Sequence, residues 1–238
     1  MSIVNTFSLQ SNRQIKINFN GGDLSSDAGL LLIKEFAAKI GFTKLIKKKF
    51  KTNDKSVRFH KDHENLLQMI YQVISAYFQD DCTDELTLDP VFHAVLDKES
   101  LASQPTLSRF FNRMDEDTLV QFDDIDKNLR DIIYSIKRPE HMLLDLDSTL
   151  FGTHGKQEGE GFNFHYQAHG YHPLLCYDGL TGDLIKAELR DGTLYCSNGA
   201  DKFMKSIFQE YLERGIKTYL RGDSGFASPK LYETCESN

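Results

Sequence analysis

Apolar residues recur every three to four positions along most of the first 137 residues, a spacing typical of amphipathic helices. A short alternation of apolar and polar residues over 15–19 predicts one strand before them. The predicted helices lie between Asp27 and Gly41, from Thr43 to about residue 51, over 63–79, in short pieces opened by Thr83 and Asp89, over 106–112, and after Asp115 to about residue 137.

The first of these helices has an apolar face that should point inward. Leu30, Ile33, Ala37 and Ile40 fall on one side of a helical projection, and Gly41 provides the residue at which a helix commonly ends. We therefore expect these four side chains to be buried.

The pattern changes at Arg138-Pro139, where strands replace helices. The second part of the chain predicts strands over 141–149, 163–177, 184–189 and 217–221, a helix over 198–214 between the last two, and a further helix from Ser228. The sequence thus predicts an α/β protein with a mainly helical region over 1–137 and a mixed β-sheet domain over 138–238.

Charge is distributed unevenly along the chain. The net charge is −7, which argues against nucleic-acid binding by the whole surface. Between residues 34 and 63, however, ten Lys and Arg face three Asp and Glu, a local surplus of seven positive charges. This segment predicts a local anion-binding face. The chain has neither a membrane-length apolar run nor an apolar signal segment, so we expect a cytoplasmic protein without membrane contact.

Two acids stand at the ends of predicted strands. Asp147 ends the first strand of the second part and Asp223 follows the fourth, 76 positions later. The order strand, strand, strand, helix, strand matches the core of an RNase H-like fold, in which the first and fourth strands are neighbours. Two close carboxylates repel unless a cation lies between them, and Mg²⁺ prefers oxygen ligands. We therefore predict a metal site at Asp147 and Asp223.

Asp145 is an alternative to Asp147, because side chains two positions apart in a strand point to the same side. The sequence favours Asp147, which lies nearer the strand end. Residues 145–149 also fit the D-x-D-x-T pattern of haloacid dehalogenase-type phosphatases, in which Asp145 would form an aspartyl-phosphate. That alternative requires parallel βαβ units after the motif, and Ala227 stands where the late motif expects an acid.

Several segments resemble the DDE group 1 transposases of bacterial insertion sequences, and they keep the order found in that family. These segments are Ser25–Gly29, Tyr77–Asp81, Leu88–Pro90, Leu101–Phe110, Leu144–Thr149, Gly170–Leu174 with Asp178-Gly179, and Leu220–Phe226. The resemblance extends over nearly the whole chain.

The resemblance implies DNA transposition: metal-dependent strand cleavage and transfer at the terminal inverted repeats of an insertion sequence, with Mg²⁺ or Mn²⁺ as cofactor. Asp147 would be the first catalytic acid and metal ligand, and Asp223 the second. The family's third acid, a Glu on a later helix, has no counterpart before Asn238. We therefore expect a C-terminally truncated, incomplete RNase H-like domain that is inactive alone. A non-catalytic, DNA-binding inhibitor of transposition is the alternative.

The same resemblance gives the basic segment a role. Its cations would contact the phosphates of double-stranded DNA, both the terminal inverted repeats and the target. The candidate DNA-binding residues are Lys44, Lys47, Lys48, Lys49, Lys51 and Arg58. A nucleoid-associated protein is expected, with a homodimer as one possible assembly.

Overall fold

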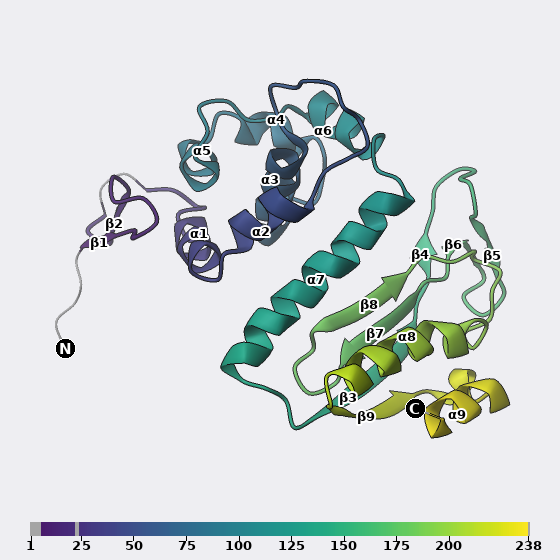
Figure 1. Ribbon diagram of the computed structural model, residues 1–238. Coiled ribbons are helices and arrows are strands. Elements are labelled where there is room, and N and C mark those ends of the chain that lie inside the picture. Colours follow the sequence, from purple (N-terminus) through teal and green to yellow (C-terminus); the bar gives the residue numbers. More distant parts are fainter. Residues whose placement is uncertain (1–5, 22–23, 238) are drawn as a thin grey trace. The chain divides into compact units, whose positions relative to one another are not determined.

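The computed structural model describes residues 6–21 and 24–237, which divide between Ile132 and Ile133 into two compact units. Figure 1 shows the helices of the first unit and the sheet of the second. The predicted boundary at 137/138 lies five residues after this division. The last turn of α7 (Glu116–Ile136) belongs to the second unit, because the hydroxyl of Tyr134 lies 3.1 Å from that of Tyr211.

The first unit begins with an antiparallel pair of short strands, β1 (Thr6–Ser8) and β2 (Lys16–Asn18). Helices follow in the predicted order. They are α1 (Leu30–Lys39), α2 (Phe42–Lys49), α3 (Asp62–Ile74), α4 (Cys82–Leu86), α5 (Pro90–Leu96), α6 (Gln104–Phe111) and most of α7. Two apolar clusters hold them: one centres on the fully buried Phe92, and the other on Ile46 and Phe110.

The inner face predicted for α1 is partly wrong. Ile33 is 38% exposed, whereas Lys34 and Glu35 are buried. The ammonium of Lys34 donates to the carbonyl of Ala94 at 2.6 Å, and Glu35 accepts hydrogen bonds from Ser11. Buried charges are tolerated where such partners exist, and these partners lie far away in the sequence.

The second unit is built on a four-stranded sheet in the order β8-β7-β3-β9. Its strands are β3 (His141–Ser148), β7 (Leu174–Asp178), β8 (Leu184–Glu188) and β9 (Lys217–Gly222). β3, β7 and β8 are antiparallel, while β9 runs parallel to β3. This arrangement agrees with the predicted strand order. It lacks the parallel βαβ units that the phosphatase alternative requires between β3 and β8.

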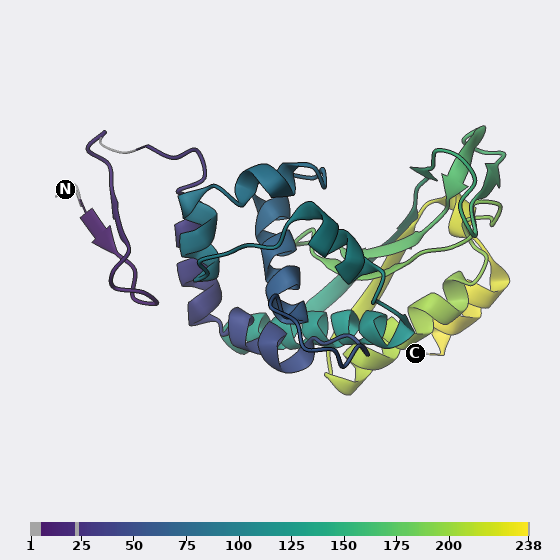
Figure 2. The same cartoon turned by 90° about the horizontal axis from the view of Figure 1, so that it is seen from above.

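One face of this sheet forms the core of the unit. The even-numbered residues of β3, Met142, Leu144 and Leu146, are buried against α8 (Ala200–Glu213) and α9 (Pro229–Glu236). Figure 2 shows both helices, in yellow-green and yellow, along the same side of the sheet. Since side chains alternate along a strand, Asp145 and Asp147 lie on the opposite face.

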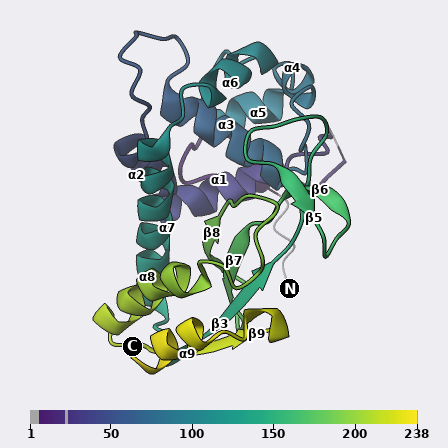
Figure 3. The same ribbon diagram turned by 90° about the vertical axis from the view of Figure 1, so that its right-hand side faces the viewer.

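The predicted strand over 163–177 is wrong, because the structure divides this segment. A second sheet in the order β4-β6-β5 contains β4 (Phe151–Gly152), β5 (Gly161–Asn163) and β6 (Ala168–Tyr171). A turn over 164–167, with Gln167 at φ 53°, separates β5 from β6. Figure 3 shows β5 and β6 as a hairpin beyond the end of β3. The η1 turn (Ser224–Phe226) follows β9.

Candidate active site

Asp147 and Asp223 lie at the same edge of the four-stranded sheet. β3 and β9 are parallel and in a register that pairs Leu146 with Gly222, so each acid directly follows a paired residue. The carboxyl ends of parallel neighbours meet at one edge, and adjacent strands lie about 4.8 Å apart. The structure therefore brings together the two acids that the sequence singled out.

Each acid is oriented by a backbone amide close to it in sequence. The N–H of Ser148 donates to Oδ1 of Asp147 at 2.7 Å, and the N–H of Gly225 donates to Oδ1 of Asp223 at 2.8 Å. No bond to Oδ2 of either acid occurs among residues 6–21 and 24–237. A carboxylate fixed through one oxygen keeps lone pairs on the other for a cation.

Asp145 is engaged differently. Its Oδ1 accepts a hydrogen bond from Nε of Arg221 at 2.6 Å, and its Oδ2 forms an ion pair with the Nη2 atom of the same guanidinium. The hydrogen bond and the charge of Asp145 raise the pKa of Arg221. A bidentate pair occupies both carboxylate oxygens. The arrangement therefore favours Asp147 over Asp145 as a metal ligand.

Tyr166, which the sequence did not indicate, lies beside the acid pair. Its hydroxyl donates to the carbonyl of Ser148 at 3.3 Å. Burial raises the pKa of Tyr166, and the negative charges of Asp147 and Asp223 raise it further. One phenol hydroxyl is thus within electrostatic reach of both carboxylates. The sequence predicted a strand where this turn lies, and therefore gave no reason to single out Tyr166.

A buried arginine, Arg190, binds backbone carbonyls of the segments around residues 172 and 196–198. Arg190 is 7% exposed, and its guanidinium donates to the carbonyls of His172 at 2.9 Å, Cys196 at 3.4 Å and Asn198. Burial lowers the pKa of Arg190, and the charge of Glu188 opposes that shift. These contacts to backbone make Arg190 a structural residue in this fold, since its charge is turned inward.

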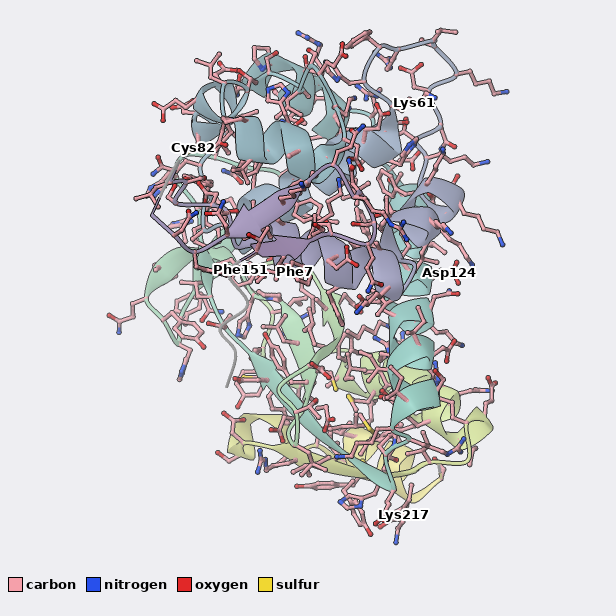
Figure 4. The ribbon with its side chains drawn as sticks, turned by 90° about the vertical axis from the view of Figure 1, so that its left-hand side faces the viewer. Phe7, Lys61, Cys82, Asp124, Phe151 and Lys217 are labelled. Carbon is pink, nitrogen blue, oxygen red and sulfur yellow. The ribbon has the colours of Figure 1, made fainter. Side chains whose placement is uncertain are left out.

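The basic segment of the first unit presents most of its predicted DNA-binding residues to solvent. Lys44, Lys47, Lys48 and Lys51 are exposed. Lys49 forms an ion pair with Asp124 at 2.6 Å, and Arg58 pairs with Asp54. In Figure 4, the labelled Lys61 marks the end of the loop before α3. Four of the six candidate cations are therefore directed outward, and two are already paired.

The loop between α2 and α3 has an internal anchor at Asp54. Hydrogen bonds from the side chain and backbone of Ser56 and from Arg58 lower the pKa of Asp54 to about 2. The backbone bond from Ser56 measures 2.8 Å. The carboxylate therefore remains charged over the ordinary pH range, and its bonds link residues 54, 56 and 58 of the loop.

The acid pair does not extend into a larger ligand cluster within the described ranges. No group of three or more His, Cys, Asp or Glu positioned to hold a metal occurs among those residues. None of the helices in the described part of the chain is long and apolar enough to cross a membrane. The acid pair is thus a two-carboxylate arrangement within this chain.

Comparison with known proteins gives the chain a family. The sequence model described as "Transposase DDE domain group 1" matches residues 7–238. No protein with a curated description matches the chain.

The solved structures that match the chain include those of two transposases. The piggyBac transposase in a synaptic complex with hairpin DNA is 16% identical, with a TM-score of 0.34; the match covers 87% of this chain and 47% of that chain. The Mos1 transposase in a paired-end complex with the left transposon end is 10% identical, with a TM-score of 0.28, covering 92% of this chain and 67% of that one. The Mos1 paired-end complex with Mn is 13% identical, with a TM-score of 0.29 and coverages of 92% and 67%.

This chain spans about half the length of the piggyBac transposase chain. The family match, in contrast, covers almost every residue and includes both strand-end acids. The protein belongs to the group 1 family of DDE-domain transposases.

Proposed function

We propose that this transposase cleaves and joins DNA strands at the terminal inverted repeats of an insertion sequence, with Asp147 and Asp223 holding Mg²⁺ or Mn²⁺. The observation that supports this most directly is the register of β3 and β9, which aligns the two acids at one sheet edge. The chemistry is phosphoryl transfer, with water as the nucleophile for cleavage and a DNA 3′-hydroxyl for joining.

The residues at the sheet edge fit a hard divalent cation. Carboxylate oxygens are the ligands that Mg²⁺ prefers, and it usually takes only one or two from the protein, leaving positions for water and phosphate. Asp147 and Asp223 each have one oxygen fixed by a backbone amide and the other unengaged within the described residues. When bound, the cation would neutralise charge that develops on the phosphate in the transition state.

The lysines of α2 would contact the DNA backbone. Lys44, Lys47 and Lys48 are exposed on one short helix, followed by exposed Lys51. Asp124 is already paired with Lys49, so it does not neutralise these lysines. Each phosphate contact by such a side chain releases counterions, which makes binding salt-dependent.

The test measures Mn²⁺ binding by calorimetry and cleavage of a duplex carrying the element's end, with purified full-chain protein. Asp147→Asn and Asp223→Asn should each weaken Mn²⁺ binding severely, whereas Asp145→Asn, which alters the carboxylate paired with Arg221, should retain it. Loss of binding in Asp145→Asn alone would transfer the role to Asp145. Mn²⁺ binding that neither Asp147→Asn nor Asp223→Asn affects would contradict the proposal.

The same purified protein also tests the alternative function, a DNA-binding inhibitor of transposition that does not cleave DNA. Salt-dependent binding to the duplex without cleavage, together with a reduced rate when the chain is added to an active transposase, would match an inhibitor. Sedimentation of the protein with and without DNA would establish whether a homodimer assembles.

A further inference from the structure

The turn that carries Tyr166 is held by hydrogen bonds to the side chain of Asn163. Oδ1 of Asn163 accepts hydrogen bonds from the backbone N–H of His165 at 3.0 Å and of Tyr166 at 3.3 Å. The amide nitrogen of Asn163, which is 5% exposed, donates to the carbonyl of Gly192 at 2.8 Å. The position of the Tyr166 backbone is therefore fixed by a buried side chain and by the loop beneath the hairpin.

The ring of Tyr166 is also supported. It packs edge-on against His172, with ring centroids 5.8 Å apart, and against His165 at 4.8 Å. His172 is 2% exposed, and its Nδ1 lies 2.7 Å from the carbonyl of Leu194, so this support does not move readily. Tyr166 itself is 40% exposed, so part of this side chain is in contact with solvent.

The hydroxyl of Tyr166 interacts with two neighbours, the side chain of Thr149 and the carbonyl of Ser148. Its bond to the carbonyl of Ser148 is 3.3 Å long, whereas hydrogen bonds between oxygens usually measure about 2.7–2.8 Å. Exchanging this partner for a charged phosphate oxygen would give a stronger bond, since hydrogen bonds to ionised groups are shorter and stronger.

The negative charge of the two acids favours a neutral hydrogen-bond donor beside them when a phosphate approaches. Two carboxylates repel an approaching phosphodiester, which is itself negative. A tyrosine phenol ordinarily has a pKa of about 10, so the hydroxyl of Tyr166 is neutral near pH 7 and can donate a hydrogen bond. The structure thus holds a neutral hydrogen-bond donor beside the two acids where the phosphate would bind.

We propose that Tyr166 is a further substrate-contacting residue whose hydroxyl donates to a non-bridging oxygen of the DNA phosphate held beside Asp147 and Asp223. This inference rests on the proposed function of the acid pair. In this proposal, the turn between β5 and β6 places one uncharged hydrogen-bond donor beside the two carboxylates.

The test compares DNA affinity with and without a cation that does not support cleavage. Fluorescence anisotropy of a labelled duplex is measured in Ca²⁺ and in EDTA for the wild-type chain, Tyr166→Phe and Tyr171→Phe. Tyr171 is the matched control, because its hydroxyl also donates to a backbone carbonyl, that of Glu158 at 2.6 Å, in the same sheet. The measured quantity is the ratio of the two dissociation constants for each protein.

In the wild-type chain the affinity should be higher in Ca²⁺. Tyr166→Phe should reduce this cation-dependent gain roughly tenfold, the usual effect of one hydrogen bond to a charged group, while the affinity in EDTA stays unchanged. Tyr171→Phe should retain the full gain. Equal thermal unfolding of the two variants would show that the loss is local to the DNA contact.

A Tyr166→Phe variant with the wild-type gain would overturn the inference and leave the proposed function standing, provided that Asp147→Asn abolishes the gain. If the wild-type chain shows no gain, and Asp147→Asn behaves like it, both the proposed function and the role of Tyr166 are wrong. The Asp147→Asn measurement thus separates the two failures.

Discussion

Replacing Gly170 by alanine should destabilise the hairpin sheet, whereas the same change at its partner Gly152 should not. The two glycines face each other in the β4–β6 pair. Neither has a φ in the left-handed region, so an alanine would fit the backbone conformation at both. The difference is space: a methyl group on Gly170 would lie 2.2 Å from the carbonyl oxygen of Phe151, while one on Gly152 would meet nothing within 4 Å.

The magnitude follows from the atoms involved. Non-bonded heavy atoms prefer separations of roughly 3.5 Å, so about 1 Å of backbone movement is needed. Overpacking typically costs about 1–3 kcal/mol, and a clash with main chain belongs at the upper end. A loss of about 3 kcal/mol changes the ratio of folded to unfolded protein roughly 100-fold. In a cooperative unit of about 100 residues, it lowers the melting temperature by roughly 12 °C.

Hydrogen exchange is the appropriate assay, because it reports stability segment by segment and does not require the two units to unfold together. Amides of 161–171 should exchange much faster in Gly170→Ala and at an unchanged or slightly lower rate in Gly152→Ala. A glycine replaced where there is room gains about 0.4–1 kcal/mol through the unfolded state. Equal exchange in the two variants would refute the steric argument.

Met204→Ala, at a fully buried position in the core of the second unit, should cost about 2–5 kcal/mol in urea unfolding; a loss below about 1 kcal/mol would contradict the packing. The Asp54 carboxylate, with its pKa of about 2, should keep its contacts through the acid range and lose them only as the pH falls through that value. An NMR titration should show this midpoint, and Arg58→Ala should move it up towards the model-peptide value near about 3.9. Lys47→Ala should reduce the slope of log affinity against log salt by about 0.9, and Lys49→Ala, paired with Asp124, should change it less; equal slopes would remove the assigned DNA contact.

The sequence predicted the acid pair because each acid stands at the end of a regular apolar strand, and because the order of the elements matches an RNase H-like fold, in which the first and fourth strands are neighbours. It favoured Asp147 over Asp145 only because Asp147 lies nearer the strand end, since both side chains lie on one face. The contact that distinguishes them, from Arg221 to Asp145, joins residues 76 positions apart and depends on the register of β3 and β9. Register is specified by packing over the whole sheet, and local pattern does not contain it.

Tyr166 could not be predicted for a different reason. Residues 163–177 contain enough apolar and aromatic residues to indicate one strand, and the turn inside it has none of the usual Asn-Gly or Asp-Gly signals. The side chain of Asn163 stabilises the turn: its oxygen accepts a hydrogen bond from the N–H of His165, and its nitrogen donates one to the carbonyl of Gly192. Gly192 lies 29 residues further along the chain, so the local sequence of the turn does not reveal this contact.

The two neighbours of β3 are made at different times during protein synthesis. β7 and β8 follow β3 closely, whereas β9 comes only after α8. At roughly 5–20 residues per second, the ribosome needs roughly 4–15 seconds to pass from Asp147 to Asp223. A nascent chain in that interval can form the antiparallel meander, whose contacts are local, but it has only one of the two acids. The two acids therefore come together late, when β9 docks beside β3, after most of the second unit has been made.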